Sequence, residues 1–158
     1  DVMKESVQAA VKSMATLNKG GAAAMIEVGV NAATDVTGFG LLGHLSQMMK
    51  ASGTSAGINW SKIPILLGAL ELANAGSVSG GTARNMEAVK EVVNCEDGIT
   101  DLEFMILADA QTSGGLLISV SEERSEALVN SLVVNETLHS SVIGKVFDGD
   151  PGIVTIWQ

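Results

Sequence analysis

Two segments of the chain repeat one order of residues: an acid, a threonine, two glycines and a Leu-Leu pair. The first runs from Asp35 to Leu42, and the second runs from Asp109 to Leu117 with one more residue before its threonine. Glycines let a backbone approach a ligand closely and direct N–H groups at an oxyanion, and a hydroxyl adds another donor. The helix expected directly after the first segment presents its positive end to an anion. The pattern therefore predicts a site for phosphate or a similar anion.

The acid at the start of the first segment needs its own explanation, because a carboxylate beside bound phosphate repels it. A Mg²⁺ ion removes this conflict, since it takes oxygen ligands and commonly joins one or two carboxylates to phosphate oxygens. Asp35 is therefore a candidate metal ligand. The alternative is that Asp35 caps the following turn and the glycines only shape that turn. The spacing alone does not decide between the two.

Other arrangements of reactive residues are weaker. Residues 38–43 satisfy the G-x-G-x-x-G string, but no acid lies about 20 residues further on to bind a ribose, so we reject a dinucleotide site. His44 and His139 have no ligand partner nearby in the sequence, and surface or capping roles are expected for both. Cys95 precedes acids that would raise a thiol pKa, which disfavours a nucleophile. No catalytic triad or Cys/His pair emerges.

The composition limits the class of protein further. A length of 158 residues with 46% hydrophobic and 17% charged residues suits one domain with a buried core. A formal net charge of -9 and 3% aromatic residues argue against binding nucleic acid, either through its phosphates or by base stacking. No segment suits a membrane-spanning helix. The single cysteine allows no internal disulfide, which favours a reduced, cytoplasmic setting.

Strands and helices that alternate along the chain must position the glycine segments. Hydrophobic periodicity and turn signals predict helices over 2–18, 22–28, 41–52, 64–76, 86–93, 102–108 and 122–133, and strands over 30–36, 56–60, 116–120, 141–147 and 153–157. Residues 148–152 (DGDPG) predict a hairpin between the last two strands. We expect an α/β (α+β) fold with a layered mixed sheet covered by helices, formed as one domain over residues 1–158.

The sequence resembles a known family at several points. Residues 33–44 (ATDVTGFGLLGH) are similar to the signature of selenophosphate synthetase, or selenide, water dikinase, and 16–18 (TLN), 80–85 (GGTARN) and 111–118 (QTSGGLLI) match it in the same order. The glycine blocks also recur, less closely, in the wider aminoimidazole-ribonucleotide synthase superfamily. Another ATP-using member of that superfamily, or a non-catalytic anion-binding domain, is the alternative.

The resemblance covers only the C-terminal domain of that family and implies an enzyme that forms selenophosphate, AMP and phosphate from selenide, ATP and water with Mg²⁺. It implies that Asp35 binds the metal. It also implies that the phosphate side of the ATP cleft is lined by Thr37, Gly38, Gly40, Thr112, Ser113, Gly114 and Gly115. The resemblance further implies that an N-terminal domain supplies the catalytic Cys or Sec, a Lys, the other metal carboxylates and the homodimer contacts. The chain alone is therefore expected to be inactive.

Two departures from the family pattern concern the loops. Family members often have Pro where this chain has Ala110, and Pro before the Gly-Gly-Thr segment where it has Ser79. Proline fixes its φ angle and thereby stiffens a loop. Both loops are therefore expected to be looser in this chain.

Overall fold

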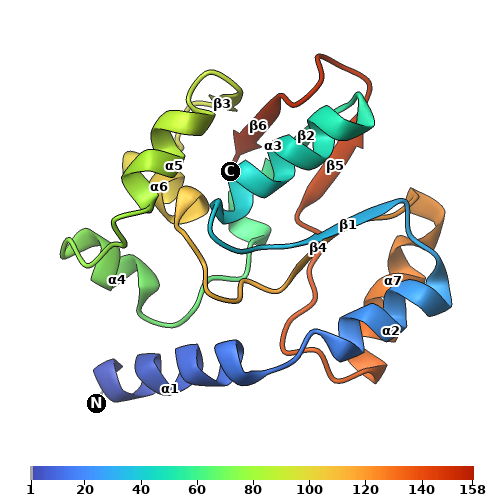
Figure 1. Cartoon of the computed structure of the whole chain (residues 1–158), viewed down its shortest axis with the longest axis horizontal. Helices are drawn as coiled ribbons and strands as arrows, with labels where there is room; N and C mark the ends of the chain where they lie inside the picture. Colours follow the sequence, from blue (N-terminus) through green and yellow to red (C-terminus); the bar gives the residue numbers. More distant parts are fainter. Residues whose placement is uncertain (1) are drawn as a thin grey trace.

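The computed structural model describes residues 2–158 and contains two β-sheets with helices packed against them (Figure 1). In the smaller sheet, β1 (Ala32–Asp35) pairs antiparallel with β4 (Leu116–Ser119). The larger sheet has the strand order β3 (Val93–Cys95), β6 (Val154–Trp157), β2 (Ser55–Asn59) and β5 (Gly144–Phe147). The helices are α1 (Val2–Ala15), α2 (Lys19–Val28), α3 (Gly40–Ser52), α4 (Ala69–Asn74), α5 (Thr82–Val89), α6 (Asp101–Ala108) and α7 (Glu122–Val134), with a short 3-10 helix over Trp60–Lys62. The predicted α/β class with a mixed sheet is confirmed.

The hydrophobic core lies where α3 packs across the larger sheet. The α3 side chains Leu42, Leu45 and Met49 are buried at a spacing of three or four residues, which places them on one face of the helix. They belong to the same cluster as Val154 and Ile156, both 0% exposed, on the central strand β6. Helices α5 and α6 also contact α3. This packing fixes the start of α3, which directly follows the first glycine segment.

A second layer is formed by α2 and α7, which lie side by side next to the smaller sheet (Figure 1). Helix α2 begins at Lys19, although Gly20 and Gly21 were expected to lie before it as a break. The glycines serve close packing instead, because a Cβ on Gly21 would lie 2.7 Å from Cδ1 of Leu116 on β4. The Ser131 hydroxyl of α7 donates a 2.6 Å hydrogen bond to the Glu27 carboxylate of α2.

The predicted hairpin between the last two strands is wrong. Strands β5 and β6 do not pair with each other, because β2 lies between them, antiparallel to β5 and parallel to β6. The 148–152 segment crosses the start of β2, where the Ser55 hydroxyl donates to the Asp150 carbonyl and the Gly152 N–H donates to the Thr54 carbonyl. The turn residues were recognised correctly, but the strand that separates β5 from β6 comes from a distant part of the chain.

Two further elements differ from the sequence prediction. Strand β3 was not expected, since 86–93 was assigned to a helix; α5 ends at Val89, and Val93 pairs with Val154 of β6. The helix predicted over 64–76 is confined to α4, because Gly68 adopts a left-handed φ of 80° just before it. A parallel strand partner about 60 residues away leaves no signal in a local pattern.

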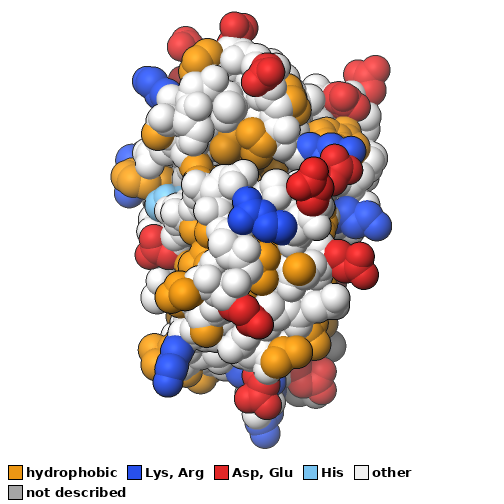
Figure 2. Space-filling model, turned by 90° about the vertical axis from the view of Figure 1, so that its right-hand side faces the viewer, with side chains coloured by type: hydrophobic (Ala, Val, Ile, Leu, Met, Phe, Trp, Pro, Cys, Tyr) orange, Lys and Arg blue, Asp and Glu red, His pale blue; other side chains and the backbone are white. Residues whose placement is uncertain are grey.

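The surface carries apolar side chains among charges of both signs. On the side shown in Figure 2, hydrophobic groups are interspersed with acidic and basic ones. Ile26 of α2 and Val134 of α7 are 85% and 80% exposed, and Val7 and Val11 on the amphipathic helix α1 are also exposed. Within residues 2–158, none of the helices is both long and apolar enough to span a membrane.

Candidate functional site

The two glycine segments lie next to each other, because the pairing of β1 with β4 continues beyond the ends of the strands. The Val36 N–H donates to the Gly115 carbonyl at 2.9 Å, and the Gly114 N–H donates to the Val36 carbonyl at 2.8 Å. The Gln111 N–H donates to the Thr37 carbonyl at 3.0 Å. The tertiary structure thus joins two loops that are more than 70 positions apart in the sequence into one candidate site.

Glycine is required at two points of this contact by the closeness of the backbones. Gly40 begins α3 with a φ of 68°, and a Cβ there would lie 2.6 Å from the carbonyl oxygen of Ala108. A Cβ on Gly114 would lie 2.9 Å from the carbonyl oxygen of Val36. A Cβ at Gly38 would have no atom within 4 Å, so this glycine leaves open space beside the loop.

The hydrogen bonds separate the predicted anion-binding residues into two groups. Three N–H groups already donate hydrogen bonds within the protein. The Thr37 N–H donates to the His44 ring, the Gly40 N–H to the Thr37 carbonyl and the Gly114 N–H to the Val36 carbonyl. Within residues 2–158, the structure gives no acceptor for the N–H groups of Gly38, Thr112, Ser113 and Gly115. Among the predicted residues, only the second group therefore has backbone N–H groups left for an anion.

Asp35 stands at the end of β1 with an exposed side chain. Its carboxylate accepts no hydrogen bond from the described residues, and the N-cap position of α3 is Phe39, which provides no side-chain cap. The capping alternative for Asp35 is therefore not observed. No group of three or more His, Cys, Asp or Glu that could enclose a metal is found in residues 2–158. One free carboxylate fits Mg²⁺ only where phosphate, water or another domain completes its oxygen shell.

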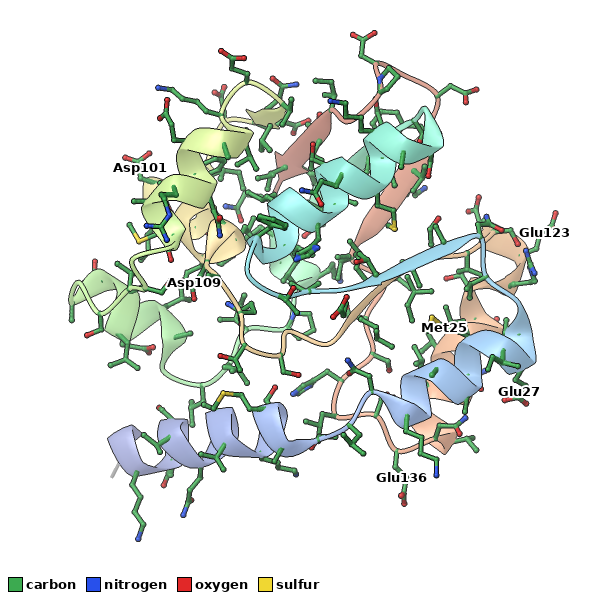
Figure 3. The ribbon with its side chains drawn as sticks, viewed as in Figure 1. Met25, Glu27, Asp101, Asp109, Glu123 and Glu136 are labelled. Atoms are coloured by element: carbon green, nitrogen blue, oxygen red, sulfur yellow. The ribbon has the colours of Figure 1, made fainter. Side chains whose placement is uncertain are left out.

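The acid of the second glycine segment has a different environment. Asp109 follows α6 (Figure 3), and its Oδ1 accepts a short hydrogen bond from the Thr82 hydroxyl. Its Oδ2 accepts a 3.1 Å hydrogen bond from the Gln111 side-chain amide. Both carboxylate oxygens thus accept hydrogen bonds within the protein, so Asp109 helps to hold the loop in place. Sequence reasoning gave these internal partners no role.

Asn85 on α5 ties the two loops together. Its side-chain amide donates to the Gly38 carbonyl at 2.9 Å and to the Ala108 carbonyl at 3.0 Å. One amide nitrogen carries two protons, so both bonds form at once. The segment 80–85 was recognised only as a match to a family motif, and the structure gives its asparagine a physical role. Arg84 is exposed beside it.

The histidines and the cysteine also have defined surroundings. His44 contacts the first glycine loop, whereas His139 is exposed in the segment after α7. Partial burial, and then the negative charge of Asp101, raise the pKa of the exposed Cys95 thiol. A raised pKa leaves less thiolate at neutral pH, as the sequence predicted.

Replacing Thr82 with Val tests the hydrogen bond to Asp109. Thr82 is 1% exposed, so losing its hydroxyl leaves a carboxylate oxygen without its donor, and we expect the free energy of unfolding to fall by about 1–3 kcal/mol. Urea denaturation measures the change. The control is Ser79→Ala, which removes the other hydroxyl in contact with Thr82 from an exposed position and should cost less than about 0.5 kcal/mol. Equal costs would contradict this role for Thr82.

Comparison with known proteins identifies the fold and the protein family of this chain. The fold is similar to that of the hydrogenase maturation protein HypE in complex with ATP, with a TM-score of 0.58 at 20% identity over 90% of this chain and 37% of that protein. The chain belongs to the family described as AIR synthase related protein, C-terminal domain, which matches residues 4–156.

Among individual proteins, this chain is similar to selenide, water dikinases. The one from Dechloromonas aromatica (strain RCB) is 40% identical over 149 residues, which are 94% of this chain and 43% of that protein. The one from Caldanaerobacter subterraneus subsp. tengcongensis is 45% identical over 145 residues, which are 90% of this chain and 41% of that protein. The chain thus spans less than half the length of these curated relatives. The matches confirm the resemblance predicted from residues 33–44.

Proposed function

We propose that this chain is the C-terminal ATP-site domain of a selenide, water dikinase, which forms selenophosphate, AMP and phosphate from selenide, ATP and water. One observation carries this proposal. Two glycine loops with free N–H groups lie together beside the free carboxylate of Asp35, in a chain that is 40% and 45% identical to two relatives of that name. Backbone N–H groups and a carboxylate-bound Mg²⁺ together suit a polyphosphate, whose charge neither would neutralise alone.

Each part of the site has a proposed role. The N–H groups of Gly38, Thr112, Ser113 and Gly115 bind phosphate oxygens, and Asp35 binds Mg²⁺. When bound, the metal neutralises the phosphates and polarises their oxygens. Gly40, Gly114 and Thr37 shape the loops and do not bind phosphate through their backbone. Their N–H groups already donate hydrogen bonds within the protein.

The remaining requirements are assigned to the rest of the full-length protein. In this proposal an N-terminal domain supplies the catalytic Cys or Sec, a Lys, the further metal carboxylates and the contacts of a cytoplasmic homodimer. The absence of a three-ligand metal cluster from residues 2–158 agrees with a site that needs ligands from elsewhere. The chain by itself is then inactive.

The test is an assay of the full-length protein with ATP, Mg²⁺ and selenide. We expect AMP and phosphate to form, with AMP formation dependent on selenide, and we expect none from residues 1–158 alone. Formation of ADP, or turnover that selenide does not affect, would overturn the proposal in favour of another ATP-using member of the superfamily. ATP binding without any turnover would favour a non-catalytic anion-binding domain.

A further inference from the structure

A histidine ring supports the first glycine loop from the following helix. His44 lies on α3, and its Nε2 is 3.0 Å from the backbone nitrogen of Thr37 and 3.2 Å from the Thr37 hydroxyl oxygen. The ring also packs against Phe39, with ring centroids 5.5 Å apart. Gly43 permits this fold of the loop, since a Cβ there would lie 2.8 Å from the Cβ of Phe39. His44 thus contacts the loop through two polar bonds and one aromatic contact.

The two polar contacts fix where the protons are. A backbone N–H can only donate, so the Nε2 atom of His44 must present a lone pair to Thr37. The imidazole is then neutral with its proton on Nδ1. Because Nε2 is an acceptor, the Thr37 hydroxyl must donate to it as well, since two lone pairs facing each other would repel. The Thr37 hydroxyl oxygen can then still accept a hydrogen bond from another group. Its proton is not available for a hydrogen bond to a phosphate.

We propose that His44 is a positioning residue for the phosphate loop: its neutral, Nδ1-protonated form holds the N–H and hydroxyl of Thr37 and so sets the direction of the next N–H group, that of Gly38. The part of this proposal that concerns the nucleotide rests on the proposed function. The protonation state and the hydrogen bond do not rest on it, because they follow from the geometry of the loop. A role limited to packing against Phe39 is the competing explanation.

The protonation state is measured directly by nitrogen NMR on the ¹⁵N-labelled 158-residue chain at neutral pH, without nucleotide or selenide. We expect the Nε2 of His44 to be unprotonated and to show a scalar coupling across the hydrogen bond to the Thr37 amide nitrogen. His139, which is exposed, is the internal reference and should show no such coupling. A proton on Nε2 of His44, or no coupling to Thr37, would overturn the proposal whatever the protein catalyses.

Two substitutions distinguish the role of His44 as a hydrogen-bond acceptor for Thr37 from its packing against Phe39. His44→Gln keeps an acceptor near the Nε2 position, and His44→Phe keeps an aromatic ring but has no acceptor. In the full-length protein with Mg²⁺, we expect the Phe variant to bind ATP about tenfold more weakly and the Gln variant to stay within about threefold of wild type. His139→Phe is the matched control and should leave binding unchanged.

The outcomes of the binding experiment are distinct. Equal loss in both His44 variants would assign His44 to packing and overturn the positioning role, as would unchanged binding in the Phe variant. A wild-type protein that binds no ATP would overturn the proposed function instead, and the NMR measurement would then decide the role of His44 alone. If His44→Phe fails to fold, the same NMR measurement on wild type decides the question.

Discussion

Replacing Asp35 with Asn in the full-length protein is expected to reduce selenide-dependent AMP formation at least roughly a hundredfold while the protein stays folded. A bound metal contributes several kcal/mol to stabilising charge on transferred phosphoryl groups, and each 1.4 kcal/mol is tenfold in rate. Asn keeps the shape of the side chain but has no charge to hold Mg²⁺. The carboxylate is exposed and accepts no hydrogen bond within residues 2–158, so its loss should cost little stability.

The matched control for this substitution is Asp148→Asn, which removes the same charge from an exposed position in the loop between β5 and β6. We expect Asp148→Asn to retain wild-type activity. The measurements are AMP formation as a function of Mg²⁺ concentration, and urea denaturation as a check on folding. Unchanged activity in Asp35→Asn would leave the family assignment in place but remove the metal role of Asp35. Equal loss in both variants would point to the net charge of the protein instead.

Replacing Gly40 with Ala is expected to lower the free energy of unfolding by about 3 kcal/mol, the largest stability effect that we predict. A φ of 68° costs an L-residue about 1–2 kcal/mol, and overpacking adds about 1–3 kcal/mol. The added Cβ would meet the Ala108 carbonyl at 2.6 Å, and Ala108 is 0% exposed, so the neighbouring backbone has no room to move away. Urea denaturation measures the loss of stability.

Gly53 provides the matched control, because it has the same φ of 68° at the end of α3 but nothing within 4 Å of an added Cβ. Gly53→Ala should therefore cost only the backbone strain, about 1–2 kcal/mol. The difference between the two variants isolates the contact between Gly40 and Ala108. If both variants lose the same stability, the close approach of the two loops contributes nothing, and glycine is needed at position 40 only for its φ angle.

The fold class and the candidate loops could be predicted because their signals are local. The Asp35–Leu42 and Asp109–Leu117 segments carry their glycines, hydroxyls and acids within a few residues of one another. Periodic apolar residues likewise predict α3 and α7 closely. The pattern could not distinguish the two acids, because Asp35 and Asp109 open segments of the same form.

The environment of each acid depends on distant residues. Thr82 binds Asp109 across 27 positions, while nothing among the described residues binds the carboxylate of Asp35. The Nε2 atom of His44 contacts Thr37, seven positions earlier, only because the loop folds back onto α3. The residue type determines which hydrogen bonds a side chain can form. The partners that the fold places beside it determine which of them it forms.

The sequence by itself thus determined two glycine segments with hydroxyls and acids, a candidate metal carboxylate and a mixed α/β architecture, because residue type and short spacing encode them. Only the tertiary structure decided that the loops lie together, that Asp109 is internally bound, and that β2 separates β5 from β6. Hydrogen bonds between strands join residues that are far apart in the chain, and burial of the apolar faces of α3, β2 and β6 selects which strands become neighbours. A local pattern contains neither kind of information.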